Sequence, residues 1–458
     1  MDSASQRSTG YRPPDMRRLA AARAIPVTLG VLVALIAGSA YLGVGSAPPA
    51  PDTAAAAASL EPSATPGGTA TPAQSELIPG SSTPPGSLAP SPFPSKVPLP
   101  QPLTAEQRDA LLQKTLDRFR KGKSIPGMSV TILFADGSSW TGGSGLADVA
   151  ASVPVTARTA FAVASVSKTF LAALIMELVQ EGKLRLDARV DRYLPELNLD
   201  SRITVRELLD HTSGLADYFL NPKIDPALQR APARVWTARQ SLAYVGKRYF
   251  PPGKGWRYSN TNYLILGLLA ERVGKASLAQ QFRKWFFGPL DLSSTFYQLA
   301  EKPRGPLATG YRLVAVGKST RAISLADGTG VAPFTSVISA TGGAGSIAAT
   351  SVDLARWARA LYGGDVLAPE TLSLMVADAA STARYKPRIP YGLGVQTLMI
   401  DGQPSLGHSG RLLGFRSQIR YFPNQQLAIS VVSNQSRTDI APLLARLVAI
   451  AFKPVVAD

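Results

Sequence analysis

Cysteine is absent from all 458 residues of this chain. Its absence excludes disulfides, thiolate-bound zinc, iron–sulfur clusters, a thiol nucleophile and a lipid-modified N-terminal cysteine. Histidine is scarce, with only His211 and His408, so a metal site built from imidazole ligands is also disfavoured. We therefore expect neither a metal nor a cofactor.

Long basic runs are missing too, although the net charge is +17. The excess is spread through residues 104–458, without a basic block of about five to eight residues or a nucleic-acid recognition motif. This disfavours nucleic-acid binding and favours a basic surface that faces an anionic cell-envelope polymer or lipid. Because 45% of the residues are hydrophobic and 17% charged, the chain can bury a large core, which excludes wholesale disorder.

The N-terminal 45 residues have the pattern of an export segment. Residues 1–23 are polar and basic, and residues 24–45 carry no charge over a length that suffices to span a bilayer. The preceding arginines predict a cytoplasmic N-terminus and an extracytoplasmic bulk. A cleaved signal peptide with small residues at Gly38 and Ala40 is the alternative, but the run exceeds a normal apolar region of about 7–15 residues, which favours a retained anchor. The arginine pair at 17–18 is a weak match to a twin-arginine export signal.

Residues 46–103 form a linker rich in Pro, Ala, Ser and Thr. They hold 15 of the 37 prolines, which fix φ and remove hydrogen-bond donors, so extended segments are favoured over a packed core. We expect a disordered spacer between the membrane and a folded domain. A disordered tail without a spacing function has the same composition.

Residues 104–458 show a mixed pattern of helices and strands. Thr104 and Gln107 resemble a capping box in front of a helical apolar stripe. Strands are predicted near both ends, at 128–134, 138–141, 391–399, 418–422 and 427–433. Helices are predicted mainly between them, at 170–179, 205–209, 263–273, 354–361 and, last, 440–452. This order predicts an α+β domain in which an antiparallel sheet from the N- and C-terminal strands is flanked by helices and holds an inserted, mostly helical region.

The first candidate for chemistry is the tetrad Ser-Val-Ser-Lys at 165–168. At spacing i, i+3 on a helix, Ser165 and Lys168 share one face, so the amine can hydrogen-bond the hydroxyl and help to deprotonate it. The helix N-terminus adds positive potential there. Taken alone, the tetrad also fits a serine that merely caps a helix.

The second candidate is Tyr-Ser-Asn at 258–260, between two helical patterns. Tyr258 can serve as a general base only if a nearby cation lowers its pKa, and Lys168 would be that cation. Asn260 would orient the lysine and a substrate amide. By itself the stretch also fits a loop with a buried aromatic ring.

The third candidate is Gly-His-Ser-Gly-Arg at 407–411. Small residues on an edge strand let a substrate backbone pair closely with the sheet. The stretch also resembles the nucleophile-elbow motif G-x-S-x-G. That interpretation fails because Arg411 replaces the last glycine, strand-like sequence follows, and no histidine comes after Ser409.

In order and rough spacing, the three motifs resemble the serine β-lactamase and penicillin-binding protein superfamily, close to class C β-lactamases, D-alanyl-D-alanine carboxypeptidases, D-aminopeptidases and serine esterases. The likeness covers roughly residues 104–452, with supporting stretches at 182–187, 203–215, 289–292 and 391–395. His211 lies in one of these stretches, and we interpret it as a structural loop residue.

The resemblance implies an acyl-enzyme on Ser165, with proton transfer shared by Lys168 and Tyr258. It assigns the backbone N–H groups of Ser165 and Arg411 to the oxyanion hole. Supporting roles in substrate binding fall to four further residues, namely Asn260, His408, Ser409 and Gly410. The hydroxyl of Ser409, together with the guanidinium of Arg411 or Arg416, would bind a substrate carboxylate.

The resemblance also narrows the substrate. Histidine replaces the lysine usual in the third motif of class C β-lactamases, which counts against a strong β-lactamase. With the export segment and basic domain, we expect a D-alanyl-D-alanine carboxypeptidase or related penicillin-binding peptidase acting on peptidoglycan-type peptides. An esterase or weak β-lactamase remains the alternative, decided by the pocket around Tyr218, Tyr297 and Phe334. A catalytically silent cell-wall-binding module would have no need of a nucleophile, lysine and tyrosine together. The sequence does not determine the oligomeric state.

Overall fold

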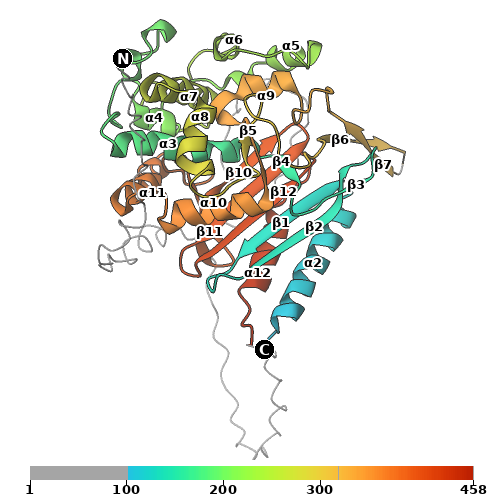
Figure 1. The fold of residues 1–458 in the computed structure, drawn as a ribbon. Helices are drawn as coiled ribbons and strands as arrows, with labels where there is room; N and C mark the ends of the chain where they lie inside the picture. The colour runs from blue at the N-terminus through green and yellow to red at the C-terminus, as the bar shows by residue number, and fades with distance from the viewer. Residues whose placement is uncertain (1–101, 318, 457–458) are drawn as a thin grey trace, which may run out of the picture. The chain divides into compact units, whose positions relative to one another are not determined.

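The structure is a computed structural model that describes residues 102–317 and 319–456 (Figure 1). The predicted basic N-terminus, the membrane segment at 24–45 and nearly all of the linker lie outside the described residues. Within the part of the chain that is described, no helix has both the length and the apolar character needed to cross a bilayer.

A seven-stranded antiparallel sheet forms the centre of the domain. Its strands, in spatial order, are β3 (Val153–Pro154), β2 (Ser139–Asp148), β1 (Gly127–Leu133), β12 (Leu427–Ser433), β11 (Phe415–Phe422), β10 (Gln403–Leu412) and β9 (Gln396–Ile400). Because β1 pairs with β12, the two ends of the domain meet in the middle of the sheet. The predicted sheet made from N- and C-terminal strands is confirmed.

Two helices from opposite ends of the domain cover one face of this sheet (Figure 1). Helix α2 (Ala105–Gly122) begins at Thr104 with the predicted capping box, and α12 (Ala441–Ala451) closes the domain. Their apolar stripes pack with the inward residues of β1 and β12 in one buried cluster. Residues such as Leu116 and Leu447 are fully buried there, so hydrophobic burial holds the two chain ends together.

The inserted region is mostly helical, as predicted. Its helices are α3 (Ser167–Gln180), α4 (Val205–Leu209), α5 (Ile224–Arg230), α6 (Ala238–Leu242), α7 (Asn260–Gly274), α8 (Leu278–Phe282), α9 (Thr335–Thr341), α10 (Ser351–Gly363) and α11 (Pro369–Ala383). Short strands accompany them, namely β4 (Ala160–Ala162), β5 (Phe296–Tyr297) and β8 (Ile347–Thr350) in one small sheet, and β6 (Tyr311–Val316) with β7 (Ser319–Ser324) as a hairpin. Helix α10 meets the large sheet through Ser351, whose hydroxyl bonds those of Ser129 and Thr131 on β1 at 2.8 and 2.9 Å.

Two predicted strand features are wrong in detail. The strand expected over 391–399 begins only at Gln396, because residues 391–394 form a turn in which Gly394 has a φ of +78°. A Cβ at Gly394 would lie 2.3 Å from that of Ala172 on α3, so only glycine allows this approach. Strand β10 is not an edge strand over its whole length, since β9 pairs with it as far as Gly407. Among the strands that the structure describes, none pairs with this edge of β10 beyond Gly407.

Candidate active site

Ser165 lies in a tight turn that leads directly into α3. The turn is a 3-10 segment, Ala164–Val166, and the preceding Ala164 has a left-handed φ of +50°. Such a conformation costs an alanine roughly 1–2 kcal/mol, a cost that the surrounding packing must offset. The turn leaves Ser165 partly exposed between buried neighbours, where its hydroxyl can meet a substrate.

Lys168 is fully buried one turn after Ser165, and its three contacts determine how its amine can act. Its Nζ lies 2.9 Å from Ser165 Oγ, 2.8 Å from Asn260 Oδ1 and 2.8 Å from the carbonyl oxygen of Ala344. The amide and carbonyl oxygens can only accept, so they take the two protons of a neutral amine. Its lone pair then faces the hydroxyl of Ser165, which is the geometry of a general base.

The pKa of Lys168 makes the neutral amine available. Burial lowers this pKa from 10.5 to about 7, and the nearby carboxylate of Asp217 opposes the shift. A lysine with a pKa near neutrality is populated as a free base at neutral pH.

The rate of acylation should therefore follow the deprotonation of Lys168. Since only the neutral amine accepts a proton, kcat/KM for acylation should rise about tenfold per pH unit at low pH and level off above pH about 7. Stopped-flow measurement of the acylation rate from pH about 5 to about 9, roughly two units on either side of neutrality, gives this profile. Asp217→Asn should move the inflection to lower pH, because the carboxylate that supports the cation is lost. A flat profile would contradict the assignment.

Asn260 is held in the required orientation by an acid that sequence analysis missed. Its Nδ2 donates to Asp217 Oδ2 at 2.9 Å, which directs Oδ1 toward Lys168. Asp217 caps the turn Tyr218–Leu220 by accepting from the backbone N–H of Phe219. Burial raises the pKa of Asp217. Asp217 lies just beyond the stretch 203–215, which supported the resemblance. Extending that stretch by two residues would have included Asp217 among the candidates.

Tyr258 reaches the same serine from the loop before α7. A hydrogen bond joins its phenol to Ser165, yet burial dominates and raises the pKa of Tyr258 above its ordinary value. Lys168 Nζ lies 5.2 Å from the centre of the ring. The condition for a tyrosinate base, a lowered pKa, is thus not met. Tyr258 is placed to act as a protonated relay, and Lys168 as the base.

Strand β10 passes directly beside Ser165. A Cβ at Gly410 would lie 3.1 Å from the backbone nitrogen of Ser165 and 2.4 Å from the carbonyl oxygen of Val163. Any side chain at position 410 would therefore push the strand away from Ser165. The close approach explains why this position is a glycine.

The register of β10 directs the backbone of Arg411 to the open edge. The backbone N–H of Thr397 on β9 donates to the carbonyl of Pro390, away from β10. The neighbouring residue, Gln396, therefore directs its peptide groups toward β10, where its partner is Gly407. Peptide groups of alternate residues point to the same edge of a strand. Ser409 and Arg411 therefore present theirs to the side where β9 has ended. The backbone N–H of Arg411 thus faces the edge of β10 that the expected oxyanion role requires.

His408 is buried and neutral. Burial lowers its pKa to about 3. Its Nδ1 lies 2.7 Å from the carbonyl oxygen of Ser409, which can only accept, so Nδ1 carries the proton and Nε2 accepts from the hydroxyl of Tyr391 at 2.9 Å. Its lone pair is thus occupied. The ring supports the wall of the site beside Tyr258, at a centroid distance of 6.3 Å, without joining the proton transfer.

A family model described as Beta-lactamase matches residues 112–453, which include all of these side chains. The chain belongs to the beta-lactamase family. The resemblance drawn from the three motifs is confirmed, and so is the predicted beta-lactamase-like α+β fold.

Among curated relatives in the family, the chain is 28% identical over 342 residues to penicillin-binding protein 4 of Amycolatopsis lactamdurans, covering 70% of this chain and 84% of the relative. It is 26% identical over 294 residues to a D-aminopeptidase of Cereibacter sphaeroides, covering 63% of this chain and 53% of the relative. The chain thus spans about half the length of the latter.

Solved structures agree on the fold. A D-stereospecific amidohydrolase from Streptomyces sp. has a TM-score of 0.63 at 24% identity, with 75% of this chain and 98% of that chain covered. The D-amino acid amidase from Ochrobactrum anthropi SV3, complexed with L-phenylalanine amide, has a TM-score of 0.64 at 23% identity and the same coverage.

His211 lies within this beta-lactamase family domain, in the predicted structural role. Its Nδ1 accepts from the backbone N–H of Ser259 at 3.2 Å and lies 3.1 Å from Asn262 Nδ2. Its ring packs on that of Tyr258 at a centroid distance of 4.3 Å. Burial lowers the pKa of His211 well below its usual range. The histidine therefore packs as a neutral ring behind Tyr258.

The expected aromatic pocket is largely wrong. The hydroxyl of Tyr218 bonds the carbonyl of Ala340 at 2.6 Å within a buried core cluster, and Tyr297 lies against a different depression. Phe334 lines a cavity of about 470 Å³ together with Leu413 and Gly414, just beyond β10, and the lining of this cavity does not include Ser165 or Lys168. The aromatic residue type alone did not show which of these side chains lie in the core and which line a pocket.

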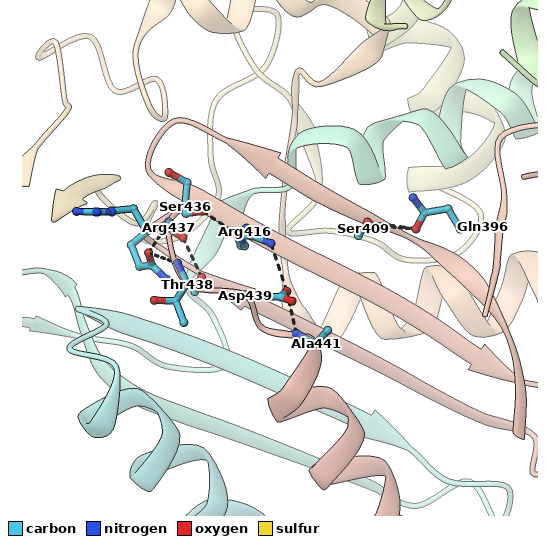
Figure 2. A network of polar contacts seen from close by, with 10 residues as sticks. Gln396, Ser409, Arg416, Ser436, Arg437, Thr438, Asp439 and Ala441 are labelled. Carbon is cyan, nitrogen blue, oxygen red and sulfur yellow. Dashed lines mark hydrogen bonds and ion pairs between the residues drawn. The ribbon is translucent and has the colours of Figure 1, made fainter. Parts of the chain in front are cut away.

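Of the two arginines expected to bind a substrate carboxylate, Arg411 and Arg416, the second contacts the loop before α12. Arg416 Nε donates to the carbonyl of Ser436 at 2.9 Å, and its NH1 lies 3.4 Å from Asp439 (Figure 2). Burial lowers the pKa of Arg416. This guanidinium already holds the loop before α12. Ser409 lies apart from it, with its hydroxyl 3.2 Å from Gln396 Oε1.

Proposed function

We propose that this beta-lactamase family protein is an extracytoplasmic serine hydrolase that releases the C-terminal D-alanine of cell-wall peptides through an acyl-enzyme on Ser165. The observation that carries the proposal is the buried Lys168, whose amine lies 2.9 Å from Ser165 Oγ and whose pKa is about 7. The penicillin-binding and D-aminopeptidase relatives support peptide-type substrates. The export segment that the sequence predicts within residues 1–45 supports the location.

In the first half-reaction, neutral Lys168 accepts the proton of Ser165 while Oγ bonds to the carbonyl carbon of the scissile amide. The negative charge on the carbonyl oxygen is held by the N–H groups of Ser165 and Arg411; such donors are typically worth about 3–4 kcal/mol each. Tyr258 passes its phenolic proton to the leaving nitrogen and regains one from Lys168. The C–N bond then breaks and D-alanine leaves.

In the second half-reaction, water attacks the ester carbonyl of the acyl-enzyme. The water gives its proton to the same base, the C–O bond to Ser165 breaks, and the serine recovers its proton. The partial exposure of Ser165 leaves its hydroxyl open to the substrate and to the water.

The test is intact-mass analysis of the full-length protein after incubation with three compounds. Benzylpenicillin should give a stable adduct on Ser165, and a peptide ending in D-Ala-D-Ala should lose one alanine. Turnover of a short-chain p-nitrophenyl ester without either result would overturn the peptidase proposal in favour of an esterase. Release of an N-terminal D-residue instead would indicate D-aminopeptidase activity. Protease protection in spheroplasts tests the extracytoplasmic location.

A further inference from the structure

The two helices at the ends of the domain, α2 and α12, leave a groove between them on the side that faces away from their buried cluster. The groove has a volume of about 390 Å³. Its lining consists of Thr115, Arg118, Arg446, Ala449, Ile450 and Lys453. None of these residues belongs to the candidate active site, so the α2–α12 groove is separate from the proposed chemistry.

Three cations converge on this groove. Arg118, Arg446 and Lys453 are exposed, and none of their side chains donates a hydrogen bond or forms an ion pair with a described residue. Lys114 and Lys121 lie four residues before and three residues after Arg118, so they extend the same face of α2. Like charges gathered in this way repel one another and do not stabilise the fold. An anion from outside the chain would be attracted to all of them.

The acidic residues of the two helices do not neutralise the groove. Helix α12 contains no acidic residue. On α2, Asp109 accepts from Arg108 Nε at 2.9 Å, and Asp117 accepts from the hydroxyl of Ser144 on β2. Glu106 lies in the first turn of α2, where the helix dipole is positive. The positive potential of the groove is therefore left for a ligand.

The groove lies at the end of the domain where the chain enters. Leu103, just before α2, forms a β-bridge with Val455, two residues after Lys453. Figure 1 shows the C-terminus beside the start of α2. The predicted spacer at 46–103 and the predicted membrane segment at 24–45 directly precede this point in the sequence. A tether to a membrane would thus join the domain beside its basic groove, and a weak contact suffices when docking is intramolecular.

Exposed apolar side chains accompany the cations. Val455 is 36% exposed and Val456 is 43% exposed. A surface that binds a bilayer combines cations, which attract anionic lipids, with apolar side chains that enter the head-group region. A soluble anionic polymer offers charge but no apolar phase that could receive the two valines. The combination favours a membrane as the partner.

We propose that the α2–α12 groove is a docking surface for a bilayer that contains anionic phospholipid. Arg118, Arg446 and Lys453 contact the head-group phosphates, and Val455 and Val456 enter the interface. The inference goes beyond the proposed peptidase activity and does not depend on it, although it takes its tether from the predicted membrane segment. Figure 1 shows α3 and α7, which supply the lysine and asparagine of the candidate site, away from α2 and α12. Docking through the groove would therefore turn that site away from the lipid.

The experiment uses a single fluorescent reporter, which the absence of cysteine makes possible. Ala110→Cys is exposed on α2, four residues before Lys114, and takes the fluorophore. The labelled full-length protein is mixed with vesicles whose head groups carry a nitroxide, which quenches only on contact. Phosphatidylcholine vesicles that contain phosphatidylglycerol should quench strongly, and vesicles of phosphatidylcholine alone weakly. Raising the salt from about 0.1 M to about 1 M should remove the difference, because the Debye length falls from about 10 Å to about 3 Å.

The combined variant Arg118→Gln, Arg446→Gln and Lys453→Gln tests the groove itself. Each basic residue near an anionic surface changes the docking equilibrium about fivefold. The ratio of docked to undocked domain should therefore fall roughly 100-fold in this variant. The fold should be retained, because glutamine favours helices and the substitutions remove repulsion between like charges. Thermal unfolding checks that the variant is folded.

A second reporter and a second variant serve as matched controls. Ala243→Cys, at the exposed end of α6, should stay unquenched with both kinds of vesicle. The combined variant Arg230→Gln, Lys302→Gln and Arg304→Gln removes three exposed cations outside the groove and should dock like the wild type.

Four results would overturn the inference. They are equal quenching of the Ala110 reporter by both kinds of vesicle, unchanged quenching in the groove variant, an equal loss in the control variant, and equal quenching of the Ala243 reporter. Flotation of the full-length protein with phosphatidylcholine vesicles tests the predicted membrane segment separately. Labelling of Ser165 by a fluorophosphonate tests the acyl-enzyme, so failure of either proposal is distinguished from failure of the docking surface.

Discussion

Ser165→Ala should abolish covalent labelling by benzylpenicillin or a fluorophosphonate and should lower peptide and ester turnover by at least roughly 10⁴-fold. The physical reason is that the alanine has no oxygen to form the acyl-enzyme. The phenol of Tyr258 cannot replace it, because this phenol is neutral and its burial raises its pKa. Intact-mass analysis and stopped-flow turnover measure both effects.

The fold should survive this change. Lys168 loses one contact and keeps those to Asn260 and Ala344 at 2.8 Å each, so the melting temperature should stay close to that of the wild type. Ser201→Ala, at an exposed turn, is the matched control and should label normally. An adduct of undiminished yield on the Ser165→Ala protein would refute Ser165 as the nucleophile.

Lys168→Met should slow acylation by roughly 10³-fold, within the range that a general base contributes. Methionine fills a similar volume but offers no lone pair to the hydroxyl of Ser165. A serine without a base is a poor nucleophile at neutral pH. Burst-phase kinetics with a chromogenic ester should show the loss in the acylation step.

The stability of this variant is a necessary control. The oxygens of Asn260 and Ala344 lose their donor, at a cost of roughly 1–3 kcal/mol each if no water replaces it, so thermal unfolding must show a folded protein. Lys183→Met, which removes an exposed lysine paired with Glu181 at 2.8 Å, should leave acylation unchanged. Acylation of Lys168→Met within tenfold of the wild-type rate would rule out Lys168 as the base.

Several local features were predictable because they depend on neighbours in the chain. The capping box at Thr104 and the helices around Phe170 and Leu354 follow from patterns of 3.6 residues. Ser165 and Lys168 share a face because of their spacing, and the structure brings Nζ to 2.9 Å from Oγ. One detail differs from the prediction, because Ser165 lies in a 3-10 segment that precedes α3 and not on the helix itself.

Other features could not be read from residue order. The supporting acid Asp217 contacts Asn260 across 43 positions, and Tyr391 reaches His408 across 17. Tyr218, Tyr297 and Phe334 are all aromatic, and only the folded structure shows that they do not line one common pocket. Residue type states what a side chain can do, but packing decides which partner it meets.

By itself, the sequence determined that Ser165 and Lys168 meet, that the chain belongs to the beta-lactamase family, and that a sheet is built from its two ends. Each rests on short-range spacing or on the order of motifs. Only the tertiary structure decided that Lys168 has a pKa of about 7, that the pKa of Tyr258 is raised, and that Gln396 stands between Arg420 and Ser409. Desolvation and contacts between distant segments set these properties, and both arise only when the chain packs.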